Sequence, residues 1–144
     1  MGGVICQIDG SEELSVSKLN PNELRDYKFF CFNGSAKFYK VDFNRFVHHQ
    51  ANYYDCNGTI LPFGEKIFPI DPNIEYTQPS SISQMIRMAE LLSIGIPFLR
   101  VDFYNINGKV YFGELTFFPA SGLGLFTPDE YNLRLGELIS LTGV

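Results

Sequence analysis

Three charged residues close together in the sequence, Arg100, Asp102 and Glu114, could hold a metal ion and a phosphate group. Side chains alternate between the two faces of a strand, so Arg100 and Asp102 share a face. Proteins hold Mg²⁺ with one or two carboxylates together with substrate phosphates, and arginine binds phosphate oxygens. The same residues could instead form a solvated cross-strand ion pair, which would contribute ~0–1 kcal/mol. The pattern alone favours the ion pair, and the aromatic neighbours Phe98, Tyr104 and Phe112 weaken that interpretation, because a nucleotide cleft would place aromatic residues beside its charges.

Whether Glu114 joins that face depends on the turn between the two strands that carry these residues. A two-residue turn at Asn107-Gly108 would set Asp102 and Glu114 on opposite faces. A three-residue turn, with Gly108 in the left-handed conformation, would set Arg100 directly opposite Glu114 and Asp102 diagonal to it. Because a slip of one residue moves every apolar side chain of a strand to the wrong face, we expect the three-residue turn.

The elements that must position these residues are aromatic-rich strands and two helices. Asn33-Gly34, between two aromatic runs, predicts a hairpin. We expect strands at 27–32, 35–41, 46–54, 98–104 and 110–118, mostly extended loops at 61–79 and 119–125, and helices at about 80–93 and from 127 to near 143. This order predicts an α+β fold, an antiparallel β-sheet with packed helices.

Each predicted helix carries an apolar stripe that should face the core. The stripe of the first helix is Met85, Met88, Ala89 and Leu92, flanked by Ile82 and Ile86. The stripe of the second helix is Tyr131, Leu135, Leu138 and Ile139. A core role is preferred to a cofactor-binding role for both stripes.

Composition narrows the class of protein. The chain has 144 residues, 45% of them hydrophobic, which suits one globular domain. Its net charge of -5 argues against nucleic acid as a partner. No apolar run is long enough for a transmembrane segment, and no signal peptide is visible at the start, so we expect a cytoplasmic protein. The three cysteines, Cys6, Cys31 and Cys56, are then free thiols.

Two further groups of residues have alternative interpretations. His48-His49 could suggest a metal pair, but adjacent strand residues point to opposite faces, so a surface role is favoured. Asp55, at the end of Tyr53-Tyr54-Asp55, could form a turn.

The strand motifs resemble the closing motif of ATP-grasp enzymes, and most closely the TupA-like group. The residues that carry this resemblance are Arg100-Val101-Asp102-Phe103, Gly108, Glu114-Leu115-Thr116 and Pro119, together with Asp26-Tyr27-Lys28-Phe29-Phe30-Cys31-Phe32-Asn33-Gly34. They span roughly Asp26 to Leu141. The resemblance implies the C-terminal portion of an ATP-grasp fold at 26–144, preceded by a partial, irregular N-terminal segment at 1–25.

The resemblance also implies ATP and Mg²⁺ as cofactors. By position, Asp102, Glu114 and Thr116 would be the metal ligands, with threonine standing where the superfamily usually has asparagine. Arg100 would be the catalytic contact to phosphate or acyl phosphate. Lys28 and Lys37, on the first hairpin, could face the phosphates, with Lys28 the one expected to bind the nucleotide, although a solvated lysine is the default interpretation. By the same analogy, Tyr53-Tyr54-Asp55 could take part in acceptor recognition.

The implied activity is Mg-ATP-dependent activation of a carboxylate, as in a ligase, within cell-surface polysaccharide or teichuronopeptide biosynthesis. Such proteins are often labelled glycosyltransferases, although no residue here supports sugar transfer by itself. The expected partners are a nucleotide, a small-molecule or polysaccharide-precursor substrate, and a separate N-terminal half that supplies the other side of the ATP clamp. The alternative is a non-catalytic truncated remnant or an interaction module.

Overall fold

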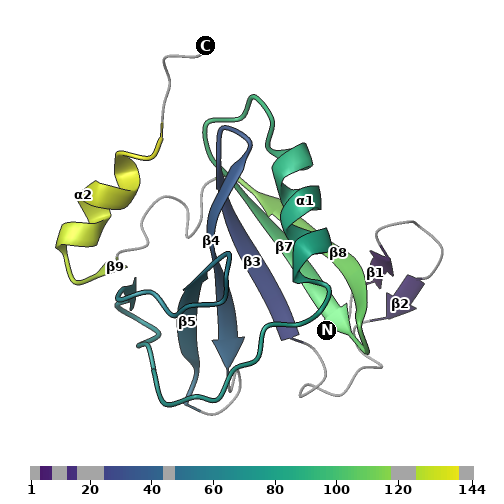
Figure 1. The fold of residues 1–144 in the computed structure, drawn as a ribbon, viewed down its shortest axis with the longest axis horizontal. Helices are drawn as coiled ribbons and strands as arrows, with labels where there is room; N and C mark the ends of the chain where they lie inside the picture. The colour runs from purple at the N-terminus through teal and green to yellow at the C-terminus, as the bar shows by residue number, and fades with distance from the viewer. Residues whose placement is uncertain (1–3, 8–12, 16–24, 44–47, 118–125, 140–144) are drawn as a thin grey trace.

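The computed structural model describes residues 4–7, 13–15, 25–43, 48–117 and 126–139 (Figure 1). The elements in chain order are β1 (Val4–Gln7), β2 (Glu13–Ser15), β3 (Arg25–Phe32), β4 (Ser35–Phe43), β5 (Gln50–Asp55), β6 (Gly64–Glu65), α1 (Ile82–Leu92), β7 (Leu99–Ile106), β8 (Lys109–Thr116), β9 (Phe126–Thr127) and α2 (Glu130–Gly136). The predicted α+β class with an antiparallel sheet is confirmed.

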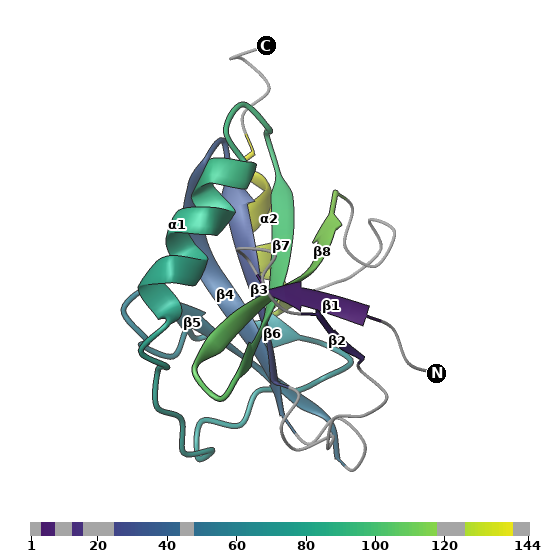
Figure 2. The ribbon, with the colours of Figure 1, turned by 90° about the vertical axis from the view of Figure 1, so that its right-hand side faces the viewer.

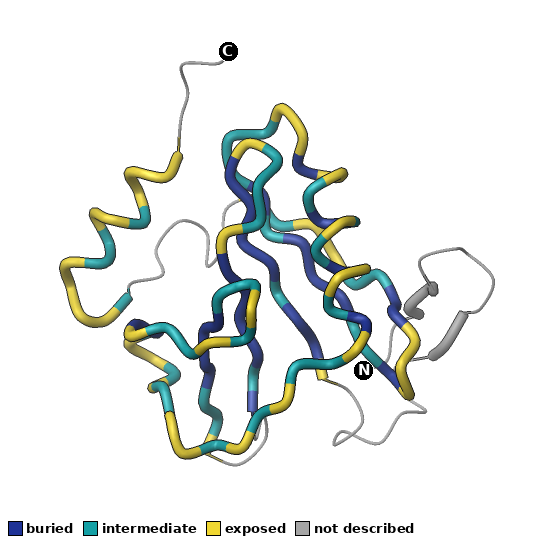
Figure 3. Tube along the Cα trace, viewed as in Figure 1, coloured by how far each residue is buried: buried dark blue, intermediate teal, exposed yellow. Residues whose placement is uncertain are grey.

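Seven strands form one sheet in the order β2-β1-β8-β7-β3-β4-β5, and β6 pairs with β9 in a separate two-stranded ribbon. Residues 1–25, expected to be irregular, supply β1 and β2, and β1 pairs with β8. Strands that are distant in sequence therefore meet at the centre, where β7 lies beside β3 (Figure 1). The centre of the sheet is its most buried part (Figure 3).

Helix α1 lies across one side of the sheet (Figure 2). Its buried residues Met85 and Ala89 pack against strand side chains such as Tyr39, Val101 and Phe103. Leu92, predicted to belong to this stripe, is 38% exposed. The helix ends close to where it was predicted to end, and Gly95 follows it with a φ of 75°, a conformation that a Cβ atom disfavours and that glycine adopts freely.

A second group of aromatic residues packs on the opposite side of the sheet. It contains Phe30, Phe32, Phe38, Tyr53 and Phe63, with Phe98, Phe126, Tyr131 and Leu135 packed against it. These last residues bring β9 and α2 to this side. Helix α2 is shorter than predicted and has no buried residue, and Leu138 and Ile139 are exposed rather than in the core (Figure 3).

Both hairpin turns lie where the sequence predicts them, but one is shorter than predicted. Asn33-Gly34 closes β3 and β4 with φ values of 52° and 83°, which is the predicted tight turn. Asn107-Gly108 closes β7 and β8 with φ values of 53° and 79°, so that Ile106 pairs with Lys109. The expected three-residue turn is therefore wrong, although Gly108 is in the left-handed conformation as predicted. Neither helix that the structure describes has the length and apolar character needed to span a bilayer.

Candidate functional site

One row of polar side chains crosses the sheet on the face away from α1. Strand pairing sets Tyr53 beside Lys40, Lys40 beside Lys28, Lys28 beside Asp102, and Asp102 beside Glu114. Directly paired residues share a face, with their Cβ atoms about 4.5–5.5 Å apart. We call these five residues the polar row; at ~4.8 Å per strand they extend over roughly 19 Å.

A β-bulge brings Glu114 into the polar row. The register shifts between Asp102 and Phe103, so Phe103 pairs with Phe112, Asp102 pairs with Glu114, and Gly113 has no partner. The bulge restores the shared face that the two-residue turn alone would have removed. Glu114 thus lies opposite Asp102 and not, as predicted, opposite Arg100.

The bulge also explains the glycine in the middle of β8. A Cβ atom on Gly113 would lie 3.0 Å from the backbone oxygen of Asp102 and 3.1 Å from a ring carbon of Tyr104. Both distances are tighter than ordinary carbon contacts, and backbone cannot move aside as a flexible side chain can. Glycine is therefore the residue that fits at this close approach.

The guanidinium group of Arg100 contacts the carboxylates of both Asp102 and Glu114. Its Nε and Nη2 atoms each lie 2.9 Å from an oxygen of Asp102, and Nη2 lies 3.3 Å from Oε1 of Glu114. Thr116 pairs with Arg100 and shares its face. The four residues predicted at the metal and phosphate site, Arg100, Asp102, Glu114 and Thr116, are therefore brought together.

Asp102 is a buried carboxylate that is held by a guanidinium group. Its side chain is 5% exposed, and burial raises its pKa from 3.8 to about 6, although Arg100 opposes that rise. A cation bound beside Asp102 would favour the ionised form of its carboxyl group.

Lys28 lies next to Asp102 and forms ion pairs with two further carboxylates. Its Nζ contacts Asp26, and it lies 3.1 Å from Oδ2 of Asp42. Burial lowers the pKa of Lys28, but Asp26, Asp42 and Asp102 outweigh burial and raise it. Lys28, predicted to bind the nucleotide, is therefore a firmly charged ammonium group adjoining the Arg100 cluster.

Asp42 connects Lys28 to the far end of the row. Its Oδ1 atom lies 2.8 Å from Nε2 of His49 and 3.7 Å from Nζ of Lys40. Burial opposes ionisation of Asp42, but Lys40 and Lys28, with His49, hold its pKa at about 2. Sequence reasoning missed Lys40 and Asp42, although their alternation with the buried apolar residues of β4 was a visible signal.

The remaining sequence candidates have local roles. Asp55 accepts hydrogen bonds from the backbone of Asn57 and Thr59, at 2.9 and 3.0 Å, as a turn-forming aspartate does. His49 stacks on Phe68 at 4.0 Å between ring centroids. In the described part of the chain no three or more His, Cys, Asp or Glu side chains gather as a metal site. A metal here would rely on two carboxylates and on oxygens from a substrate.

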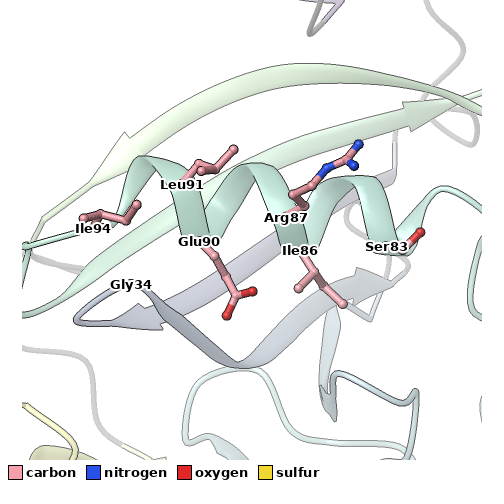
Figure 4. A pocket seen from close by; sticks show the side chains of 7 residues that line it. All are labelled: Gly34, Ser83, Ile86, Arg87, Glu90, Leu91 and Ile94. Atoms are coloured by element: carbon pink, nitrogen blue, oxygen red, sulfur yellow. The ribbon is translucent and has the colours of Figure 1, made fainter.

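A shallow hollow of about 360 Å³ lies elsewhere, beside α1. It is lined by Gly34, Ser83, Ile86, Arg87, Glu90, Leu91 and Ile94 (Figure 4). It is on the side of the sheet that α1 covers, and it shares no residue with the polar row. It is not part of the candidate site.

The family comparison agrees with the strand motifs. Residues 12–140 match the family model described as TupA-like ATPgrasp. The chain belongs to the TupA-like ATP-grasp family. The match reaches further toward the N-terminus than Asp26, where the motif resemblance begins. Searches of curated proteins and of solved structures gave no match.

ATP-grasp proteins typically bind ATP with Mg²⁺, and the residues of the polar row suit that ligand. Asp102 and Glu114 are paired across neighbouring strands, so that their carboxylates lie on the same face of the sheet. Arg100 and Lys28 supply cationic donors beside them for phosphate oxygens. The donor set is therefore chemically appropriate for a magnesium nucleotide in this member of the family.

Proposed function

We propose that the polar row binds MgATP and that the protein serves in activation of a carboxylate for cell-surface polysaccharide biosynthesis. One observation carries the proposal: Asp102 and Glu114 are directly paired, with the guanidinium of Arg100 lying on both. A solvated surface pair would leave both partners exposed, whereas the side chains of Asp102 and Arg100 are 5% and 13% exposed. The side chain of Glu114 is 65% exposed, so it lies at the solvent side of this pair. The pathway and the ligase-like reaction are inferred from the motif resemblance.

The residues have distinct parts in this proposal. Asp102 and Glu114 would hold Mg²⁺, with the hydroxyl of Thr116 as a further oxygen donor. With a cation there to neutralise Asp102, the guanidinium of Arg100 would be available for phosphate oxygens. Lys28, one strand away, binds phosphate from the other side of Asp102.

ATP supplies the γ-phosphoryl group that a substrate carboxylate accepts as ADP leaves, and an amine or similar nucleophile then displaces the phosphate. Arg100 and Lys28 stabilise negative charge on the transferred group because they are preorganised and largely buried. We propose that a separate N-terminal half completes the clamp around the nucleotide, so binding is to be measured for the chain alone and for the chain with that half.

Isothermal titration calorimetry with MgATP tests the proposal. Asp102→Asn combined with Glu114→Gln should weaken MgATP binding more than about tenfold, since a contact to a charged group is worth ~1.5–3 kcal/mol. Glu137→Gln, at an exposed residue outside the row, is the matched control and should bind like the parent.

The result also separates the proposal from its alternative. Unchanged affinity in the double variant would show that the metal assignment is wrong. Absence of MgATP binding by the parent chain, alone and with an N-terminal ATP-grasp half supplied, would favour a non-catalytic remnant or an interaction module.

A further inference from the structure

The far end of the polar row has hydrogen-bond donors with few acceptors. Lys40 and Tyr53 are direct cross-strand partners on β4 and β5. The hydroxyl of Tyr53 is fully buried and makes no hydrogen bond of good geometry within the described residues, although the Glu65 carboxylate lies near enough to help raise its pKa. A buried polar group without a partner costs ~1–3 kcal/mol, so its presence here calls for a ligand or a role.

Lys40 is only loosely paired. Its side chain is 7% exposed, and its Nζ lies 3.3 and 3.4 Å from the two carboxylate oxygens of Glu65. These distances are long for a charge-assisted hydrogen bond, which is typically about 2.7–2.9 Å. The other carboxylate near Lys40, that of Asp42, lies at 3.7 Å and already contacts Lys28 and His49.

The contact with Glu65 indicates that a carboxylate is a suitable partner for these donors. It presents a carboxylate to Lys40, and its charge is, after burial, the largest cause of the raised pKa of Tyr53. Glu65 belongs to β6, a strand of 2 residues that is paired only with β9 in the described structure. The carboxylate of a ligand could therefore replace that of Glu65 on this short strand, and the charge around Lys40 would stay the same.

The position of Lys40 and Tyr53 in the polar row suggests why a ligand carboxylate would replace Glu65. Asp102 and Glu114 lie at one end, Lys28 follows, and Lys40 with Tyr53 come next. Neighbouring strands are ~4.8 Å apart, so a group held by Lys40 lies about one strand spacing from a phosphate held by Lys28. Metal, phosphate and carboxylate would then lie in the order that phosphorylation of a carboxylate requires.

We propose that Lys40 and Tyr53 form the subsite for the substrate carboxylate, and that Glu65 fills this subsite until the substrate displaces it. This inference rests on the proposed function for the identity of the site, but the binding event itself can be tested without nucleotide. The ligand class is a small-molecule carboxylate, for which acetate is the simplest probe.

Carbon NMR of the full 144-residue chain with ¹³Cζ-labelled tyrosine reports on this subsite directly. The Tyr53 signal is assigned by its loss in Tyr53→Phe. Acetate should shift that signal in a saturable manner, whereas chloride at equal ionic strength should not. The tyrosines on the α1 side, such as Tyr39 and Tyr54, should keep their shifts and so report that each variant is folded.

Variants of the two charged partners should act in opposite directions. Glu65→Gln removes the competing charge and should tighten acetate binding about tenfold. Lys40→Gln removes the cation and should weaken it by at least about tenfold. A merely structural ion pair would not give this opposite response, because losing either partner would have the same consequence.

The outcomes keep the two proposals apart. No acetate-dependent shift at Tyr53, or an affinity lowered or unchanged in Glu65→Gln, would overturn the carboxylate subsite even where MgATP binds normally. Acetate binding with the expected opposite responses would support the subsite even where calorimetry shows no MgATP binding, which would count against the proposed function alone.

Discussion

The free energy of unfolding of Asp102→Asn, measured relative to that of the parent, should be higher at neutral pH than at acid pH. The side chain is 5% exposed, and its pKa rises from 3.8 to about 6 on folding. Between these values the folded state holds the proton more tightly than the unfolded state, so the parent loses stability as pH rises through this window. Two pKa units at 1.36 kcal/mol each amount to ~3 kcal/mol.

Urea unfolding of both proteins, followed by far-UV circular dichroism at pH values of about 3.5, 5, 6 and 7.5, measures this effect, because these values extend from below the unfolded-state pKa of Asp102 to above its folded-state pKa. Asparagine does not titrate, so the free energy of unfolding of Asp102→Asn minus that of the parent should increase by ~3 kcal/mol from the lowest to the highest pH. Any fixed loss of hydrogen bonding to Arg100 cancels in this comparison. Mg²⁺ should stabilise the parent at neutral pH and leave the variant unchanged.

A pH-independent difference would refute this reasoning, and so would a difference that changes in the opposite direction. The first result would mean that Arg100 compensates the buried charge in full, and the second that the attraction to Arg100 exceeds the cost of burial. Glu137→Gln, at an exposed residue directly after α2, provides the control for general effects of removing one carboxylate.

Three further predictions concern other features of the fold. Gly113→Ala should lower the free energy of unfolding by ~1–2 kcal/mol, measured in urea, because its Cβ would lie 3.0 Å from the Asp102 backbone oxygen. Asp42→Asn should lower the free energy of unfolding by ~2 kcal/mol at pH 7, because the pKa of Asp42 is about 2 in the folded protein and 3.8 in an unperturbed aspartate. This contribution is present above pH 3.8 and should disappear as the pH falls through 2, which acid titration of both proteins would check. Cys31, fully buried with its pKa raised by burial to about 12, should resist iodoacetamide in the folded protein and react after unfolding, as read by peptide mass spectrometry.

The strands were the part of the fold most accessible from sequence, because their signals are local. Asn33-Gly34 marks a hairpin wherever it stands between aromatic runs, and the structure has that turn. The last helix was harder: its apolar residues suggested a core face, but Leu138 and Ile139 are exposed. Periodicity indicates which side of a helix is apolar and does not show how much of that side another element covers.

The candidate site shows a different limit of sequence reasoning. The shared face of Asp102 and Glu114 was inferred from a turn that the protein does not have, and the bulge at Gly113 produces the same result. An isolated glycine within a strand is a recognised sign of a bulge, so that signal was present. The pairing of Lys28 with Asp102 joins strands far apart in sequence, and no local pattern specifies it.

The position of β7 beside β3 has a consequence for how the protein folds. Strands β3, β4 and β5 are consecutive antiparallel neighbours, as are β7 and β8, so each group can form through short loops. The contact between the groups closes a much longer stretch of chain, and long-range pairing of this kind is the slow part of folding. Lys28, Lys40 and Tyr53 come from the first group, and Asp102 and Glu114 from the second. The protein therefore becomes able to bind a ligand across the polar row only late in folding, when the β3–β5 group pairs with the β7–β8 group. A ligand that contacts both groups would stabilise this pairing.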